Sequence, residues 1–407
     1  MNFLIFLAAL PHPQVDLDGP WQLTLEGQLR PRVVAHSGRD FVSEEAFDQL
    51  YISQRSRLGF VVAHEDGTVV TLRLQDVRFW GEEKDTQDGT ADGFDMHEAF
   101  LRLPLLEDTT LTVGRQVISW DQQRLVGAGN WTQRGRSFDG LRLRYQDEAL
   151  DTEIIAVPVL TSANSHPPQG DADGHVDPAR VDDVWLLGAH ASGKVAEGLA
   201  ISGLYLYRQN GALEEKRHTV GGLISYGQGG FTTSAEGYYQ LGELGEATLG
   251  AWMGGLRLGY ALDVALRPRL VLIGDVLSGD GTPEGAFDTL YGTNHGYYGE
   301  LDFFTNIPVN TRGLGLVDLG GQASIEPTQG VVFKAAFHGL RSVEPGLGGD
   351  TAFGQEVDLN LEWQVSEPLR VAALVGFFLP GDLWSLLVGV ADPSPEQALY
   401  LTTDYTF

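Results

Sequence analysis

The sequence at residues 21–32 is Trp21-Gln22-Leu23-Thr24-Leu25-Glu26-Gly27-Gln28-Leu29-Arg30-Pro31-Arg32, with apolar or small residues at the odd positions and polar residues at the even ones. The same period of two recurs in Val357-Asp358-Leu359-Asn360-Leu361-Glu362-Trp363. At the end of the chain Leu399, Leu401, Tyr405 and Phe407 again share one face. Because successive side chains of a β-strand point to opposite faces, this period predicts strands with one apolar and one polar face.

Turn-forming residues divide the rest of the chain into similar segments, and eighteen strands are predicted in all. They lie near 21–36, 51–65, 68–80, 94–104, 108–120, 136–146, 150–160, 182–193, 197–208, 216–228, 230–241, 246–261, 266–278, 311–326, 330–341, 353–364, 368–379 and 397–407. Short and long connections alternate between them, except near 242–245. Outer-membrane barrels have this pattern of tight periplasmic turns and long external loops. The sequence therefore predicts an all-β fold, a transmembrane antiparallel β-barrel of about 18 strands.

One uniform pattern runs from 21 to 407, which predicts a single barrel domain over that range. Residues 1–20 are a possible signal or leader segment, because Phe3–Leu10 is apolar, although it lacks a preceding basic region and an obvious cleavage site. That run is also far shorter than the roughly 18 residues of a membrane helix. A large soluble β protein is the alternative fold. A propeller would repeat a motif about every 40–50 residues, and no such motif is found.

Charge and composition exclude several functions. The 407 residues contain 27 Lys+Arg and 55 Asp+Glu, which gives a net charge of −28 and disfavours nucleic-acid binding. The absence of cysteine excludes disulfides, thiolate metal sites and cysteine nucleophiles. No hydrolase or zinc-protease motif is present, so no cofactor and no catalysis are expected, although a Ser/His pairing inside a barrel stays open. The acidic surplus lies largely in the predicted loops, where calcium bridging is an alternative to simple solvation.

Arginine greatly outnumbers lysine in this chain. There are 23 Arg and only four Lys, and fourteen of the Arg lie between Arg30 and Arg144. An arginine side chain on the lipid face would destabilise the barrel by about 2–4 kcal/mol at mid-bilayer. Two arginines at positions i and i+2 of a strand share one face, so such pairs are predicted to point into the barrel. These pairs are Arg30/Arg32, Arg55/Arg57 and Arg142/Arg144. Their forked donors suit carboxylates, and together they would focus a positive potential in the lumen. Simple pairing with lumenal carboxylates is the alternative.

Two composite motifs carry a family resemblance. Gly114-Arg115-Gln116, Arg124-Leu125-Val126-Gly127, Asn130-Trp131 and Gly135-Arg136-Ser137-Phe138-Asp139-Gly140 form the first, and the second runs from Phe287 through Asn294-His295 to Asp302. They resemble the alginate-export family of outer-membrane porins, and the likeness extends over nearly the whole chain from Trp21. The resemblance implies an eighteen-stranded barrel whose arginine-rich lumen conducts a polyuronate.

The resemblance also implies roles for single residues. Arg115, Arg124 and Arg136 would lie at or near a constriction, with Glu98 and Asp139 as acidic partners. Arg115 shares its face with Leu111 and Val113, so an inward Arg115 requires a bulge. Polysaccharide exporters of the family carry a long periplasmic turn before the last strand pair. Here the link is only Val365–Pro368, so any gate is expected from the external loops 161–181 and 279–310.

These observations predict a passive outer-membrane channel for an anionic, uronate-type polysaccharide such as alginate. The alternative is a general or nutrient-uptake porin for small anionic solutes; an enzyme housed in the barrel and a structural or adhesive barrel are the other rivals. The expected partners are that solute, outer-membrane lipid, the barrel assembly machinery and periplasmic polysaccharide-synthesis proteins, with no nucleic acid. The assembly machinery is expected to recognise the face formed by Leu399, Leu401, Tyr405 and Phe407.

Overall fold

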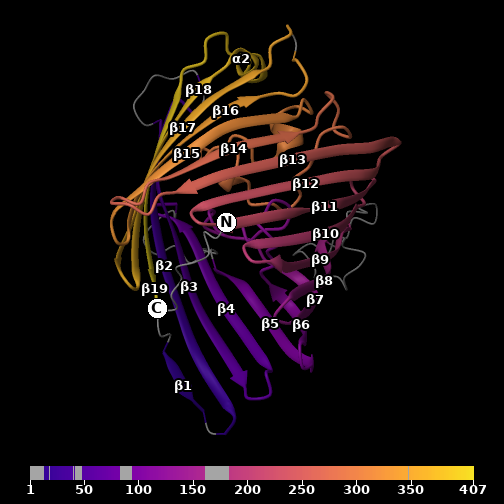
Figure 1. Ribbon diagram of the computed structural model, residues 1–407, viewed down its shortest axis with the longest axis vertical. Helices are drawn as coiled ribbons and strands as arrows, with labels where there is room; N and C mark the ends of the chain where they lie inside the picture. The colour runs from indigo at the N-terminus through magenta and orange to yellow at the C-terminus, as the bar shows by residue number, and fades with distance from the viewer. Residues whose placement is uncertain are drawn as a thin grey trace.

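The computed structural model describes residues 13–17, 19–39, 41, 48–82, 94–160, 183–346 and 348–407. Long strands dominate it (Figure 1). Their bounds are β1 (Gln14–Asp16), β2 (Trp21–Ser37), β3 (Gln49–His64), β4 (Val69–Phe79), β5 (Phe94–Leu106), β6 (Thr109–Gln116), β7 (Phe138–Gln146), β8 (Leu150–Leu160), β9 (Val184–Ala196), β10 (Leu199–Asn210), β11 (Glu215–Gln228), β12 (Phe231–Leu244), β13 (Ala247–Ala261), β14 (Arg269–Leu277), β15 (Leu316–Thr328), β16 (Val331–Arg341), β17 (Ala352–Ser366), β18 (Leu369–Pro380) and β19 (Glu396–Thr406). The helices are η2 (Asn294–Gly296), α1 (Ile307–Asn310) and α2 (Asp382–Val388).

Strands β2 to β19 form a closed barrel. Each pairs antiparallel with the next along the chain, and β19 returns to β2, where Gln28 to Ser37 face residues of β19. The part of β2 that β19 does not cover pairs instead with β1, through Gln14 and Thr24. No edge of these strands is therefore left open along the seam, which removes the usual hazard of an unpaired strand edge. The predicted eighteen-stranded antiparallel barrel is confirmed.

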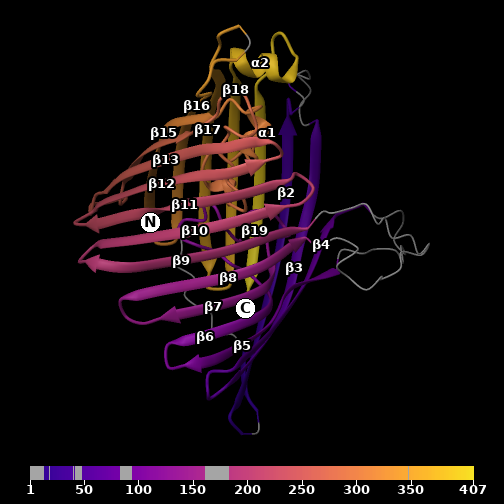
Figure 2. The same cartoon turned by 90° about the vertical axis from the view of Figure 1, so that its right-hand side faces the viewer.

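The two ends of the barrel differ. Short connections lie at one end, which we call the turn end: 65–68, 107–108, 147–149, 197–198, 229–230, 262–268, 329–330 and 367–368. Longer connections lie at the other, the loop end, where only 211–214 and 245–246 are short (Figure 2). The connection at 367–368 confirms that no long turn precedes the last strand pair. The acidic stretches 83–93 and 161–182, including the predicted gate at 161–181, lie outside the described residues.

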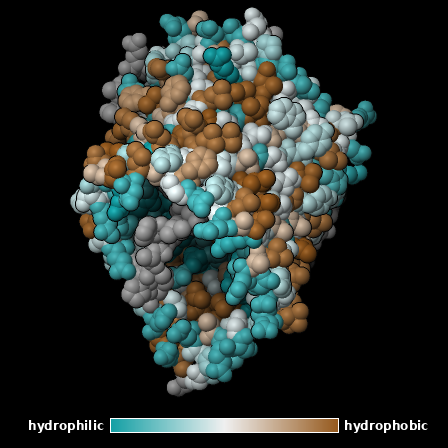
Figure 3. Space-filling model, in the orientation of Figure 1, coloured by the Kyte–Doolittle hydropathy of each residue, from teal (hydrophilic) through white to brown (hydrophobic). Residues whose placement is uncertain are grey.

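The outer wall is apolar and the inner wall is mixed. On β7, Leu141 and Leu143 are exposed on the outside, while Arg142 and Arg144 alternate with them and point into the barrel. Figure 3 shows hydrophobic residues over much of the outer surface and a hollow bordered by hydrophilic residues between β10 and β4. Among the described residues, no helix has the length and hydropathy to cross a membrane.

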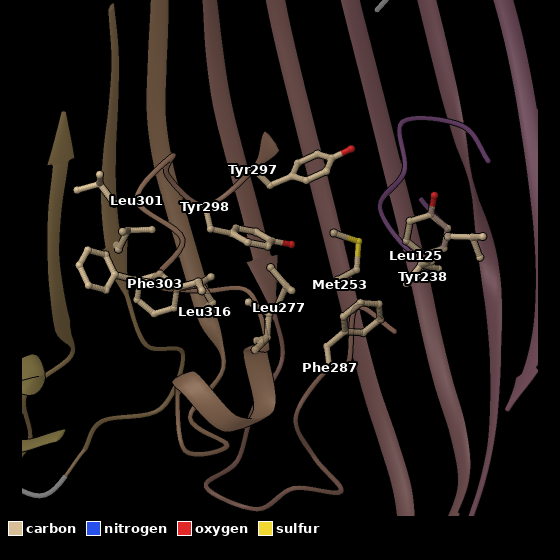
Figure 4. Packing of buried hydrophobic residues seen from close by; sticks show 14 of the residues in the cluster. Leu125, Tyr238, Met253, Leu277, Phe287, Tyr297, Tyr298, Leu301, Phe303 and Leu316 are labelled. Carbon is tan, nitrogen blue, oxygen red and sulfur yellow. The ribbon is translucent and has the colours of Figure 1, made fainter. Parts of the chain in front are cut away.

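Two connections from the loop end fold into the barrel and form a hydrophobic core. We call them the 117–137 loop and the 278–315 loop. They join along backbone hydrogen bonds such as Tyr291 N to Leu125 O at 2.9 Å. Phe287 and Tyr298 of the second loop are fully buried and lie near the wall residues Leu277 and Met253, while the buried Leu301 lies on the side of Phe303 (Figure 4). Apolar wall residues at this core are stabilised because the loops remove them from water.

These inward loops explain where the strand prediction was wrong. The segment predicted as a strand over 108–120 ends at Gln116, and the one over 311–326 begins only at Leu316. Ile118 and Trp120 keep a spacing of two, but they have the parity of the inward Thr112 and Gln116 of β6, and both are buried in the loop core. Their apolar side chains face the interior of the barrel and not lipid, and a period of two does not distinguish these environments.

Candidate functional site: arginines inside the barrel

Four arginines from two adjacent strands meet inside the barrel. Arg30 and Arg32 lie on β2, Arg55 and Arg57 lie on β3, and Arg30 is directly opposite Arg55 in the strand register. We call these four the arginine cluster. Arg30, Arg32 and Arg55 are buried from solvent. Their inward direction follows from the alternation with Leu29 and Leu58, which are exposed on the outer wall. In the structure both pairs therefore point into the barrel.

The arginine cluster holds the backbone of the 117–137 loop. The Arg30 guanidinium donates to the Gln133 side chain at 3.0 Å, to the carbonyl of Asn130 at 2.7 Å and to that of Thr132 at 2.6 Å. The Arg57 side chain donates to the carbonyl of Arg134 at 3.2 Å and to Gln75 Oε1 at 2.7 Å. The loop is thus fixed against one side of the lumen by forked donors that can bind several acceptors at once.

The oxygen atoms that accept these hydrogen bonds are neutral, so the site keeps a net positive charge. Within the described part of the chain, no member of the arginine cluster forms an ion pair with a carboxylate, whereas Arg73 on the next strand binds Glu26 and Glu98. Carbonyl and amide oxygens satisfy the donors but do not cancel the charge. Four positive charges therefore remain on one side of a low-dielectric wall, where a field is poorly screened.

Trp131 connects the arginine cluster to the 278–315 loop. The Arg32 guanidinium lies 3.8 Å above the Trp131 ring, and the His295 ring stacks on the indole at 3.7 Å. The indole N–H donates to Asp302 Oδ2 at 3.0 Å, and His295 Nδ1 lies 3.0 Å from the other carboxylate oxygen. The Asn130-Trp131 and Asn294-His295 motifs were noted in the sequence, but their contact was not predicted.

Arg124 was expected at or near a constriction; it lies in the 117–137 loop inside the barrel, where its guanidinium is buried from a passing solute. Its guanidinium is fully buried, binds Glu236 at 2.5 Å and Asp275 at 3.1 Å, and donates to the Tyr298 hydroxyl at 2.9 Å. Burial by itself lowers the pKa of Arg124, but Asp275 and Glu236 outweigh it and raise that pKa well above its ordinary value. This arginine fastens the 117–137 loop to β12 and β14.

Arg136 likewise joins the two inward loops. Its guanidinium donates to the carbonyl of Gly127 at 2.9 Å and to that of Tyr291. Burial lowers the pKa of Arg136 from its ordinary value. These backbone contacts occupy the Arg136 side chain, which was expected at or near a constriction, and join the two loops that lie inside the barrel.

Arg115 and Asp139 are on the outer side of the wall, so their assignment to the lumen is wrong. They face each other in the register of β6 and β7 and form an ion pair at 2.8 Å. Their neighbours two residues along, Val113 and Leu141, are exposed to the outside. The bulge that an inward Arg115 requires is absent, because the pairing around it is continuous.

Arg142, Arg144 and Glu98 do point inward, and each has a partner of opposite charge. Arg142 binds Glu153, and Arg144 binds Asp151 at 2.5 Å. Glu98 pairs with Arg73 and accepts a hydrogen bond from the backbone N–H of Val117 at 3.3 Å. For these residues the alternative interpretation, solvation of the interior by paired charges, describes the structure.

A serine and a histidine also meet inside the barrel. Ser137 Oγ lies 3.0 Å from His97 Nδ1. A hydrolytic triad needs a third group that orients the histidine. No carboxylate binds His97 within the described ranges, and no group of three or more His, Asp or Glu there is arranged to hold a metal ion.

Comparison with known proteins decides the family. The family model described as alginate export matches residues 21–391. The chain belongs to the alginate-export family. The resemblance inferred from the motifs is confirmed, and so is the location in the outer membrane of a Gram-negative bacterium, where family and fold are those of channels. Among curated proteins, no sequence matches the chain.

Solved porins from Pseudomonas aeruginosa share the fold. OpdO is 13% identical, with a TM-score of 0.64 over 95% of this chain and 97% of its own. OccK8 (OprE) is 13% identical, with a TM-score of 0.62 over 95% and 98%. OpdK, solved with vanillate, is 11% identical, with a TM-score of 0.61 over 95% and 98%. Identities this low show a common barrel architecture.

Proposed function

We propose that this outer-membrane channel conducts anions passively and that its cargo is a uronate-type polysaccharide such as alginate. The observation that carries the proposal is the arginine cluster, whose guanidinium groups meet neutral acceptors and keep their charge. The donors of the cluster are taken up by the 117–137 loop, so it acts on a passing solute through its charge: a solute that bears carboxylates is attracted to the positive potential of this wall. The direction of transport is that of the solute's own gradient.

Uptake of small anionic solutes is the second candidate. It is favoured by the inward loops, whose packed core occupies part of the lumen and narrows the path. The fold neighbour OpdK, solved with vanillate, gives a precedent of the same architecture with a small carboxylate. Block of the current by alginate oligomers, compared with block by single sugar acids, separates the two candidates.

Under both candidate functions, the protein acts without catalysis. Its further partners are outer-membrane lipid, the barrel assembly machinery and, for export, periplasmic polysaccharide-synthesis proteins.

Ion selectivity tests the proposal. In planar bilayers with a KCl gradient, the wild-type reversal potential should show preference for chloride. Replacing Arg55 and Arg57 together by Gln keeps hydrogen-bond donors but removes two charges, so the reversal potential should shift toward potassium, most clearly at low salt. Arg267→Gln is the matched control, because Arg267 is exposed in the 262–268 turn and paired with Glu326. A wild-type channel that prefers potassium would contradict the proposal.

A further inference from the structure

A separate cavity lies at the turn end of the inner wall. It has a volume of about 210 Å³ and is formed by β5, β6 and β7 with the 107–108 connection. Arg102, Thr112 and Arg142 are in register across these three strands, so the two arginines flank the threonine. Neighbouring strands are about 4.8 Å apart, which places the arginine Cα atoms about 10 Å from each other. The short threonine side chain between them leaves the space that forms the cavity.

Arg102 differs from the other two arginines that line the cavity in its lack of polar partners within the described part of the chain. Its guanidinium lies 5.5 Å from the Phe100 ring, and it makes no hydrogen bond or ion pair with any residue the structure describes. Arg142 and Arg144, in contrast, are tied to Glu153 and Asp151, although the buried Nε of Arg142 has no partner. A guanidinium with five free donors beside the hydroxyls of Thr110 and Thr112 is arranged to bind a planar carboxylate.

The other side of the cavity limits which anions fit. Glu107 and Asp108 of the connection line it, and both are exposed. Carboxylates accept hydrogen bonds and repel further negative charge. They suit the hydroxyl groups of a sugar and disfavour a dianion. The volume is below the roughly 300–1,000 Å³ of common ligand pockets, so it fits one ring and not a length of polymer.

We infer that this cavity is a turn-end binding site for a single uronate unit, whose carboxylate binds Arg102 and whose hydroxyls bind Thr112, Glu107 and Asp108. The site would present the anionic solute to the channel at the end opposite the long loops. The inference rests on the proposed function, because it names the chemistry of a solute on the same path.

Binding of D-glucuronate to the detergent-purified full chain tests the inference. Arg102→Gln should weaken that binding at least tenfold, as loss of a charge-assisted hydrogen bond implies. Thr112→Val should weaken it by a smaller factor, and Arg267→Gln, at the same end but outside the cavity, should leave it unchanged. D-Glucose, which lacks the carboxylate, and acetate, which lacks the hydroxyls, should both bind more weakly than D-glucuronate.

Two results would overturn the inference: equal D-glucuronate affinity in Arg102→Gln and wild type, or acetate binding as tightly as D-glucuronate. If Arg102→Gln does not give a heat-modifiable barrel, D-glucuronate binding to Arg102→Lys and Thr112→Val tests the inference instead. Arg102→Lys keeps the positive charge of the wall, and Thr112→Val keeps the shape of the side chain. The reversal potential of the same wild-type preparation separates the two proposals. Chloride preference without a D-glucuronate site ends this inference alone, whereas potassium preference ends the proposed function.

Discussion

Trp131 shows how one side chain connects distant parts of the lumen. Its ring has a cation on one face and an imidazole on the other, and its N–H is bound to a carboxylate. Each of these contacts is modest, about 0.5–2 kcal/mol for a cation–π or aromatic pair. Together they tie the arginine cluster on β2 to the 278–315 loop.

Replacing Trp131 by Ala should loosen the inward loops without opening the wall. We expect a loss of about 1–3 kcal/mol in unfolding free energy and larger open-channel current fluctuations, because both stacked contacts are lost. Trp131→Phe is the matched control, since it retains an aromatic ring and loses only the hydrogen bond to Asp302. Single-channel recordings check the expectation, and identical current noise in Trp131→Ala and wild type would contradict it.

At the scale of residues, the sequence predicts to which face of the barrel wall a side chain points better than it predicts what that side chain binds. The alternation correctly places Arg30, Arg32, Arg55 and Arg57 inside. It does not reveal that they hold the 117–137 loop, because Arg30 and its acceptor Gln133 are 103 positions apart. Arg115 and Asp139 were assigned from the family motif against the period of two, and there the period was right: neighbours Val113 and Leu141 face outward.

At the scale of elements, the pairing of β2 with β19 closes the barrel. Gly27 and Phe407 exchange two backbone hydrogen bonds, at 2.9 and 3.0 Å. The Phe407 ring lies over Gly27, so a Cβ atom there would be only 2.1 Å from ring carbons. A residue larger than glycine at this point must displace the terminal aromatic ring or separate the strands.

Gly27→Val should therefore reduce the yield of heat-modifiable barrel, and Gly27→Val with Phe407→Ala should recover part of it by removing the clash. Gly254→Ala in β13 is the control, because a Cβ atom there meets nothing within 4 Å. Loss of the barrel upon Phe407→Ala alone would instead show that the assembly machinery reads the aromatic ring itself. A normal yield from Gly27→Val would contradict the packing described here.

The strands were predictable because contact with lipid requires the same of every strand. Its outer face must be apolar, and all its backbone groups must be paired. This requirement does not act on segments inside the barrel. The 278–315 loop has buried residues such as Phe304 and Ile307 without any regular period, and its fold depends on the wall around it. Its length suggested an inward position, but its core could not be predicted from the sequence.

At the scale of the whole molecule, the inward loops determine how wide the path is. Gly281 and Gly313 are joined by a backbone hydrogen bond of 3.0 Å, so the chain enters and leaves the lumen at nearly the same point. Residues 282–312 can therefore be removed, and the two glycines joined, with little change to β14 and β15.

Deleting residues 282–312 should raise single-channel conductance, because the lumen loses the part of the packed core that this loop contributes. Anion preference should fall, since a wider path is less affected by the field of the arginine cluster. Heat-modifiability reports whether the barrel still forms. An intact barrel with unchanged conductance would show that the 117–137 loop alone sets the narrowest point.

Strand β2 has two tasks: it forms the closing seam with β19, and it carries Arg30 and Arg32, which bind the 117–137 loop. This arrangement imposes an order of events on biogenesis. While the seam is open, β2 is held on one side only, by its pairing with β3, and Arg32 lacks its partner Thr402 of β19. We therefore expect the 117–137 loop to reach its final position, and the pore its final width, only after β2 and β19 have paired.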